Sequence, residues 1–281
     1  MPELPEVQTV VNTLAPGIVG RMITGVSLLR ADVVRSPAPD LPDRLPGRSI
    51  FEVFRRGKKI VVRLDDDTAV CIHLGMTGRL TLESPDAPLQ PHTHLTITVG
   101  RTSPARCAVD NAHRCQLRFR DPRRFGGIWC LKRYDEAAGN LGPEPLHMSC
   151  GQLAARLART TRAVKTALLD QKLVAGLGNI YVDESLYDAR IHPLIPAGRL
   201  TDQQVRRLTG SIKRILHRAL AAGGSSFRDY VDADGRKGDF QKLHRVYARA
   251  GLPCRRCRTP IQRTVVGGRS THFCPNCQRY E

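Results

Sequence analysis

Two short cysteine motifs, CRRC at residues 254–257 and CPNC at residues 274–277, stand near the end of the sequence. Two such knuckles at this spacing bring four thiolates to one tetrahedral zinc ion, and the loop between them, residues 258–273, is predicted to form a β-hairpin. The alternative, a pair of redox dithiols, needs each motif at a helix N-terminus, whereas Pro275 and the neighbouring arginines favour a ribbon. Because four thiolates saturate the metal, the zinc is expected to be structural. Its predicted ligands are Cys254, Cys257, Cys274 and Cys277.

The composition favours a folded protein with a polyanionic partner. The chain has 281 residues, enough for two or three domains, of which 41% are hydrophobic and 25% charged. Lysine and arginine total 44 against 26 acidic residues, a formal net charge of +18. So large an excess repels itself, which makes solubility alone a weaker explanation than binding. Nucleic acid is the first candidate and an acidic membrane surface the second, while charge does not choose between DNA and RNA.

Neither a membrane span nor a targeting segment is evident. No stretch approaches the ~20 consecutive apolar residues that cross a bilayer. The first six residues, MPELPE, are acidic and rich in proline, unlike the start of a signal or transit peptide. We therefore expect an intracellular, cytoplasmic protein. In a reducing compartment the scattered thiols are more often small core residues than disulfide partners; they are Cys71, Cys107, Cys115, Cys130 and Cys150.

The first half of the chain has the pattern of a β-structure. Residues 20–130 carry short apolar runs, such as 50–54, 60–64, 69–72 and 95–99, separated by turn signals. This pattern predicts a β-sandwich or barrel. Ahead of it, apolar residues from Val7 to Leu14 have the spacing of an amphipathic helix, which is expected to follow the first six residues. The N-terminal domain is predicted to span residues 1–134.

The pattern becomes helical after a segment rich in glycine and proline near residues 139–145. Residues 150–222 look wholly helical, and GLGN at 176–179 interrupts an apolar run. This predicts two helices joined by a tight turn, the outline of a helix-turn-helix, with a helix hairpin in the core as the alternative. A helical domain is predicted over 135–224, and a loop with the zinc finger over 225–281.

Pro2 becomes a candidate nucleophile if the initiator methionine is removed. Its free amine would be secondary, and an α-amine with a pKa of about 8, below the ~10.4 of lysine, has a substantial neutral fraction at pH 7. Addition to C1′ of a deoxyribose expels the base and leaves a cationic iminium, which withdraws electrons for β-elimination. Glu3 can supply or remove protons beside it. From the residues alone, a helix-entry proline is the simpler interpretation.

Five further motifs occur in a definite order with the cysteine ribbon: PELPEV at 2–7, RGK at 56–58, HLGMTG at 73–78, DPRRFG at 121–126 and GLGNIY at 176–181. In these the chain resembles formamidopyrimidine-DNA glycosylase over nearly its whole length. The resemblance implies an α+β multidomain fold. Its parts are an N-terminal β-sandwich with a catalytic N-terminal helix, a helix-two-turns-helix DNA-binding domain and a C-terminal β-hairpin zinc finger.

The resemblance also implies catalytic roles. Pro2 matches the Schiff-base nucleophile, and Glu3 the general acid that assists opening of the sugar ring. Lys58 matches the lysine that aids elimination and contacts DNA at the lesion, with a solvated basic turn as the alternative interpretation. Arg269 matches the catalytic arginine at the tip of the zinc hairpin, which grips the phosphates flanking the lesion.

Three side chains match the group that fills the gap left by an everted base: Met76, Arg123 and Phe125, with Arg123 facing the orphaned cytosine. Filling that gap offsets an unstacking cost on the order of a few kcal/mol. Without the resemblance, Met76 and Phe125 would be assigned to the core.

Further DNA contacts follow from the same resemblance. His92, Lys165 and Asn179 match phosphate contacts, and free backbone N–H groups in the glycine turn at Asn179 can also hold an oxyanion. Residues 223–238 resemble the mobile loop that closes over the flipped base. A disordered linker is the alternative interpretation of that glycine-rich segment.

Three departures from the family pattern stand out. Lys59 occupies a position that is usually aromatic or apolar, and Arg258 one that is usually glycine. The segment between residues 99 and 116 is longer than typical and contains two extra cysteines. None of these lies at a predicted catalytic position.

The expected function is that of a bifunctional DNA glycosylase/AP lyase of base excision repair. We expect it to remove 8-oxoguanine and formamidopyrimidines from duplex DNA through a Schiff base at Pro2, and to cleave the strand by β,δ-elimination. Duplex DNA with oxidised bases or abasic sites is the expected partner, one zinc ion the cofactor, and a monomer the expected state. The rival within the fold is an endonuclease VIII-like enzyme for oxidised pyrimidines, against which Leu4 and the Met76, Arg123, Phe125 set argue. A non-catalytic damage-binding zinc protein and a generic RNA-binding protein are rivals of other classes.

Overall fold

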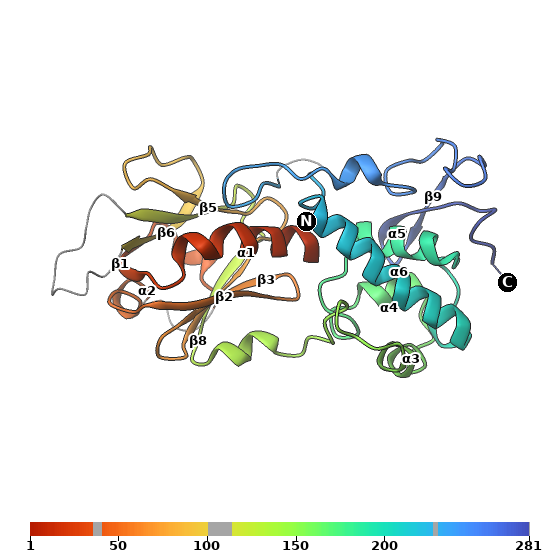
Figure 1. The fold of residues 1–281 in the computed structure, drawn as a ribbon, viewed down its shortest axis with the longest axis horizontal. Helices are drawn as coiled ribbons and strands as arrows, with labels where there is room; N and C mark the ends of the chain where they lie inside the picture. The colour runs from red at the N-terminus through yellow and green to blue at the C-terminus, as the bar shows by residue number, and fades with distance from the viewer. Residues whose placement is uncertain (36–40, 101–113, 227–229, 281) are drawn as a thin grey trace. The chain divides into compact units, whose positions relative to one another are not determined.

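The computed structural model describes residues 1–35, 41–100, 114–226 and 230–280 (Figure 1). The chain divides into two compact units, which we call unit 1 and unit 2. Unit 1 contains Met1–Gly139 and Gly223–Gly238, and unit 2 contains Asn140–Ala222 and Asp239–Glu281. Within the described ranges, no helix is both long enough and apolar enough to cross a membrane.

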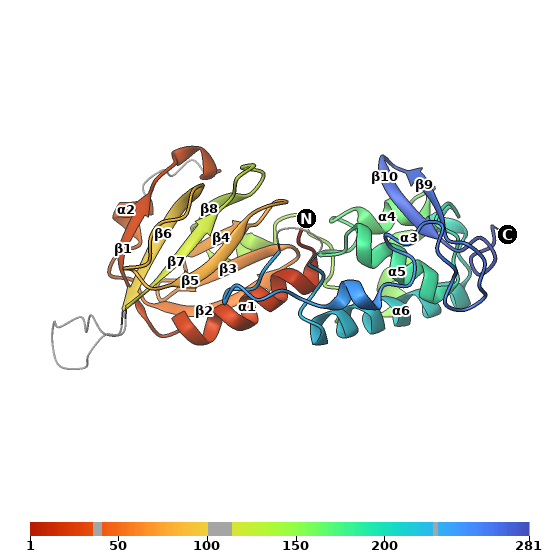
Figure 2. The ribbon, with the colours of Figure 1, turned by 90° about the horizontal axis from the view of Figure 1, so that it is seen from above.

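Unit 1 is a sandwich of two four-stranded antiparallel sheets (Figures 1 and 2). One sheet has the order β1-β6-β7-β5, with β1 at Met22–Leu28, β6 at Thr93–Gly100, β7 at Cys115–Arg120 and β5 at Arg79–Glu83. The other has the order β2-β3-β4-β8, with β2 at Ile50–Arg56, β3 at Lys59–Leu64, β4 at Ala69–His73 and β8 at Gly127–Leu131. Two short helices, η1 (Ala31–Val33) and α2 (Leu41–Arg44), follow β1, and η3 (Tyr134–Ala138) follows β8. The predicted β-sandwich is confirmed.

Both sheets and helix α1 (Leu4–Ile18) share one hydrophobic core. The core includes Ile60 and Val62 of β3, while Val61 between them points to the other face of the sheet and is buried in a second, smaller cluster. The apolar stripe of α1 from Val7 to Leu14 is fully or almost fully buried, as its helical spacing predicted. The helix begins at Leu4, however, and not after the sixth residue. Its start lies earlier because the Glu6 carboxylate accepts the backbone N–H of Glu3, which satisfies a donor at the helix N-terminus.

Unit 2 is built on four α-helices: α3 (Cys150–Leu157), α4 (Val164–Leu169), α5 (Asn179–Ala189) and α6 (Asp202–Ala221). The expectation that residues 150–222 are wholly helical is wrong, because turns and the 3₁₀ helix η4 (Ala197–Arg199) separate these helices. The segment between α4 and α5 is a turn stabilised by the side chain of Gln171, whose amide accepts from Gly176 N and donates to Leu177 O. The glycine turn that was predicted at residues 176–179 therefore leads directly into α5.

The predicted β-hairpin of the cysteine ribbon is present. Strand β9 (Gln262–Val266) pairs with β10 (Arg269–Phe273) in antiparallel register, and β10 packs against α5. Figure 2 shows the hairpin beside the helices of unit 2. Helix η5 (Phe240–Leu243) lies in the segment that leads to it.

The two units differ from the predicted domain boundaries at residues 134 and 224. Residues 223–238 pack with unit 1, where Tyr230 and Ala233 join the sandwich core. The zinc hairpin packs with the helices, so the predicted region 225–281 is divided between the two units. Of the extended segment between residues 99 and 116, residues 101–113 lie outside the described part of the chain.

The position of Arg258 generates a prediction about stability. Its backbone has a φ of 67°, in the left-handed region that favours glycine, and glycine is the residue expected there from the family pattern. A side chain in this conformation costs about 1–2 kcal/mol, part of which is offset because glycine has more freedom in the unfolded chain. We expect Arg258→Gly to raise the free energy of unfolding by about 1 kcal/mol in guanidinium titrations.

Arg255→Gly is the matched control, because Arg255 lies in the same knuckle without a positive φ. It should lower the stability. If both variants change the stability equally, the backbone at residue 258 is not strained.

Candidate active site and nucleic-acid interface

The start of the chain is held in place at the N-terminus of α1. Pro2 and Glu3 are buried. The Glu6 carboxylate accepts two backbone N–H groups, from Glu3 at 2.8 Å and from Ser225 at 2.7 Å. Gly224 has a φ of 80°, and a β-carbon there would lie 2.8 Å from the same carboxylate. Glu6 thus joins the chain start to the segment 223–226, where the positive φ of Gly224 favours glycine.

Lys58 lies in the tight turn between β2 and β3, and its exposed fraction is only 8%. Arg55 braces this turn, because its guanidinium donates to Gly57 O at 2.8 Å and to Gln8 Oε1 on α1 at 3.0 Å. These contacts tie the turn that carries Lys58 to the helix that begins just after Pro2. Such burial does not fit a solvated basic turn.

His73, at the end of β4, is a residue of this region that the motif-based selection missed. Burial, together with the nearby charges of Lys58 and Lys59, lowers the pKa of His73 to about 4. The ring is therefore neutral at neutral pH. Its Nδ1 accepts the N–H of Gly75 at 3.2 Å, which places the remaining proton on Nε2. The sequence feature that could have identified His73 as a site residue was its position at the start of the HLGMTG motif.

Met76 and Phe125 are exposed, with fractions of 45% and 54%, so an assignment to the core is excluded. The Arg123 guanidinium stacks over the Phe125 ring at 4.5 Å. The two loops that carry these side chains touch, since a β-carbon at Gly75 would lie 2.5 Å from the carbonyl carbon of Phe125. The structure therefore gathers Met76, Arg123 and Phe125 into one exposed group, which we call the wedge group.

Asp121 holds the wedge group together, although its exposed fraction is zero. One carboxylate oxygen accepts the Thr77 hydroxyl at 2.5 Å, and the other accepts Gly126 N at 2.8 Å. Its backbone N–H donates to His92 O at 3.0 Å, so His92 lies beside the same loop. His92 is exposed and has a φ of 67°, a strained conformation of the kind found at functional sites. Neither Asp121 nor Thr77 was among the site residues predicted from the sequence.

The other predicted DNA contacts lie in unit 2. Arg269 is exposed at the start of β10, and its side chain has no hydrogen bond or ion pair within the described residues. Asn179, at the start of α5, donates its amide to Ser270 O at 2.9 Å. Lys165 is fully buried and forms an ion pair with Asp183, with 2.6 Å between Nζ and Oδ1. Its predicted contact with a phosphate stays a prediction, because its ammonium is turned inward here.

The four cysteines of the ribbon fit a zinc ion. Their sulfur atoms all lie within 4.8 Å of one another, and Cys257 Sγ is 3.4 Å from the sulfurs of both Cys274 and Cys277. A tetrahedral site with zinc–sulfur bonds of about 2.3 Å has sulfurs about 3.8 Å apart. The Tyr187 hydroxyl lies 3.2 Å from Cys254 Sγ and the N–H of Arg256 3.4 Å from it, contacts that stabilise a metal-bound thiolate.

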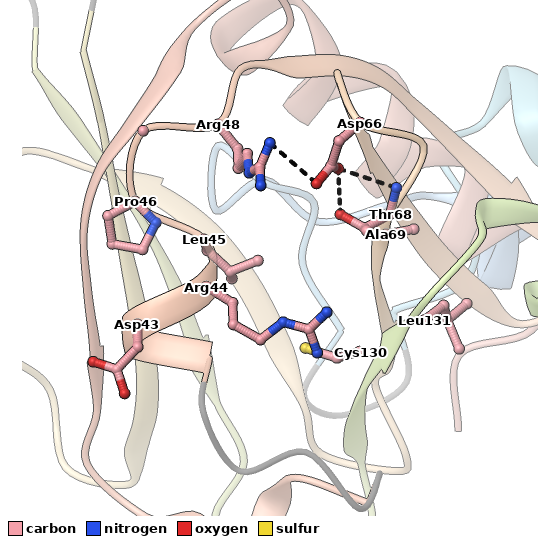
Figure 3. A pocket seen from close by; sticks show the side chains of 11 residues that line it. Asp43, Arg44, Leu45, Pro46, Arg48, Asp66, Thr68, Ala69, Cys130 and Leu131 are labelled. Atoms are coloured by element: carbon pink, nitrogen blue, oxygen red, sulfur yellow. Dashed lines mark hydrogen bonds and ion pairs between the residues drawn. The ribbon is translucent and has the colours of Figure 1, made fainter.

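A cavity of about 390 Å³ lies elsewhere in unit 1, between the residues after α2, the β3–β4 turn and β8 (Figure 3). Arg48 and Asp66 face each other across part of it in an ion pair of 3.3 Å. Arg44 and Cys130 line another part. None of the predicted catalytic or DNA-binding residues lines this cavity.

Comparison with known proteins defines the class. Residues 1–128 match the formamidopyrimidine-DNA glycosylase N-terminal domain, and residues 141–231 match the H2TH domain of the same enzyme. Residues 251–279 match the zinc finger found in FPG and IleRS. The three domains follow one another along the chain, as in a zinc-finger DNA glycosylase.

The similarity to known relatives extends over nearly the full length of the chain. The chain is 44% identical to the formamidopyrimidine-DNA glycosylase of Solibacter usitatus, covering 99% of this chain and 100% of the relative. A mutant of the Lactococcus lactis FPG, bound to DNA containing Fapy-dG, superposes with a TM-score of 0.88 at 36% identity, covering 99% and 100% of the two chains. MutM in complex with DNA containing carbocyclic 8-oxo-G gives a TM-score of 0.87 at 36% identity and the same coverage. The chain belongs to the formamidopyrimidine-DNA glycosylase family, and its cysteine cluster is the zinc finger of that family.

Removal of the zinc is expected to unfold the ribbon of unit 2. Thiolate-bound structural zinc contributes on the order of 10 kcal/mol to the folding of isolated fingers, and the ribbon has only a small core around Cys254, Ile261 and Cys274. Amide hydrogen exchange should show loss of protection in β9 and β10 after chelation, and recovery after zinc is returned. Unchanged protection in the metal-free protein would show that the hairpin folds without the ion.

Proposed function

We propose that this protein is a bifunctional DNA glycosylase and AP lyase that removes 8-oxoguanine and formamidopyrimidines from duplex DNA. The observation that carries the proposal is the wedge group. Two large apolar side chains and an arginine are exposed together on loops held by a buried carboxylate, in the same unit as the buried Pro2 and Glu3. Water is a poor environment for such apolar side chains, whereas the stack of a duplex that has lost one base is a favourable one.

The first chemical step is assigned to Pro2 and Glu3. With Met1 removed, the secondary amine of Pro2 attacks C1′ of the damaged nucleotide, and the bond to the base breaks as the amine proton passes to the leaving base. Glu3 protonates the sugar ring oxygen as the ring opens, which leaves an iminium between Pro2 and the sugar. The contacts of Glu6 support this assignment, because they fix the backbone on which both groups stand.

The second step breaks the strand. The iminium acidifies the proton at C2′, and its loss expels the 3′ phosphate. A second elimination then expels the 5′ phosphate. Lys58 is assigned to the proton transfers, and its braced, largely buried turn supports a fixed position for its ammonium. Arg269 is assigned to the phosphates that flank the lesion. The zinc takes no part in these steps, because its four thiolates leave no open position.

The wedge group is assigned to the gap that the flipped base leaves. Met76 and Phe125 replace the lost stacking, which offsets an unstacking cost on the order of a few kcal/mol. Arg123 has hydrogen-bond donors for the partner base, and His92 and Asn179 are the proposed phosphate contacts. Residues 223–238 are the proposed lesion-recognition loop, supported by the bond from Ser225 to Glu6.

The proposed partner is duplex DNA with oxidised bases or abasic sites, bound by a monomer in the cytoplasm, where the basic charge keeps the protein on the nucleoid. Preference for oxidised pyrimidines and damage binding without catalysis are the alternatives. The identity of the released base distinguishes a preference for oxidised pyrimidines from the proposal. Covalent trapping distinguishes damage binding without catalysis from it.

The decisive experiment traps the covalent intermediate. Borohydride should reduce the iminium and fix the protein to a duplex containing 8-oxoguanine, with the adduct in the N-terminal peptide. A chain that retains Met1 should not be trapped, because an acylated nitrogen has no lone pair for C1′. Glu3→Gln should block base release but retain some cleavage of abasic DNA, whose sugar already presents an aldehyde. Trapping at a lysine in the blocked chain would refute the role of Pro2.

The wedge group predicts a split between two substrates. Met76→Ala and Phe125→Ala should slow base excision more than cleavage of a preformed abasic site, because only excision requires an intact base to be held outside the stack. Arg123→Ala should also reduce discrimination between partner bases, since a bidentate base contact contributes about 1–3 kcal/mol. Single-turnover rates on both substrates measure the split. Leu89→Ala, which truncates another exposed apolar side chain of unit 1, is the matched control and should leave both rates unchanged.

A further inference from the structure

A buried ion pair links the helices of unit 2 to the zinc hairpin. Lys165 on α4 and Asp183 on α5 have side chains with zero exposure. A buried charge is tolerated only when it is paired and its other hydrogen-bonding positions are filled. Here one strand, β10, hydrogen-bonds to both members of the pair. Lys165 Nζ donates to Ser270 O at 2.8 Å, and Asp183 Oδ2 accepts His272 N at 2.8 Å.

The same strand begins with Arg269. The carbonyl of Ser270, the next residue, is held twice, by Lys165 and by the amide of Asn179 at 2.9 Å. The preceding turn is also close to α4, since a β-carbon at Gly267 would lie 2.9 Å from Thr166 Oγ1. The backbone on both sides of Arg269 is therefore fixed, while its side chain is exposed and without a partner among the described residues.

We propose that Lys165 and Asp183 are positioning residues that aim Arg269 at DNA, and that Lys165 does not itself bind a phosphate. This inference rests on the proposed function, in which Arg269 grips the phosphates beside the lesion. For Lys165 to reach a phosphate, its ammonium must leave Asp183, and an uncompensated carboxylate would remain buried. Arg269 has no such constraint. The pair thus acts through the strand that it holds.

A double-mutant cycle between Lys165 and Arg269 tests the proposal. The measured quantity is the salt dependence of equilibrium binding to a duplex with an uncleavable abasic analogue, whose slope falls by about one unit for each lost phosphate contact. Lys165→Met and Arg269→Ala should each lower the slope by about one unit, and the double variant should lower it no further. Additive losses of about two units would show that Lys165 makes its own phosphate contact and would overturn the proposal.

Asp183→Leu gives an independent outcome. If Lys165 only positions the strand, this variant should also lose about one unit of slope. If Lys165 binds phosphate, freeing it from Asp183 should leave the slope unchanged or increase it, which again overturns the proposal. Asp183→Asn, which keeps an acceptor for His272 N, should show a smaller loss and covers the case in which the leucine variant does not fold.

Two controls separate positioning from general damage to the ribbon. Zinc content should stay at one ion per chain in every variant that enters the cycle. Lys172→Met removes the same charge from an exposed lysine. In that background Arg269→Ala should still lower the slope by about one unit. Because the assay involves no chemistry, failure of borohydride trapping would contradict the proposed enzyme without affecting this cycle, whereas absence of any duplex binding would overturn both.

Discussion

A carboxylate that is buried away from water must have its oxygens hydrogen-bonded, and this constraint organises both units of the protein. In unit 1 the carboxylate of Asp121 accepts a hydroxyl and a backbone N–H from two different loops. In unit 2 the carboxylate of Asp183 accepts a lysine from α4 and a backbone N–H from β10. Each carboxylate therefore holds together segments that are distant in the chain. The exposed side chains that these segments carry, and that are proposed to contact DNA, depend on the carboxylate for their position.

The side chains that are proposed to contact DNA are different from the buried side chains that hold their loops and strands in place. Met76, Phe125 and Arg269 are exposed, so they are accessible to a ligand. The energy that orders them comes from buried polar contacts behind them, where a low dielectric strengthens each hydrogen bond. Substitution of a buried positioning residue should therefore have the same effect on DNA binding as substitution of the exposed residue that it positions. This is why a phosphate contact and a positioning role cannot be distinguished by a single substitution at Lys165.

The departures from the family pattern have local explanations where the structure describes them. Lys59 stands where an apolar side chain is usual, and its ammonium lies 5.3 Å from the centre of the Trp129 ring, so the stem packs while the charge meets an aromatic face. Arg258 replaces glycine at a left-handed position and carries the strain of that conformation. Arg258 directly follows the zinc ligand Cys257, and its backbone N–H donates to Cys254 O at 3.0 Å. Neither change replaces a residue of the wedge group or a zinc ligand, so the family chemistry is compatible with both.

The sequence by itself determined the features that depend on short spacing: the zinc ligands within two knuckles, the apolar runs of the core strands and the apolar stripe of α1. Ordered motifs were also sufficient to identify the family, because each motif is contiguous. Only the tertiary structure decided that Met76 and Phe125 are exposed, that Lys165 is buried, and that Asp121 and Asp183 hold the loops around them. These properties depend on partners far away in the chain, such as Thr77 for Asp121 and Ser270 for Lys165. A local sequence pattern does not determine which distant backbone group will contact a given side chain once the core has packed.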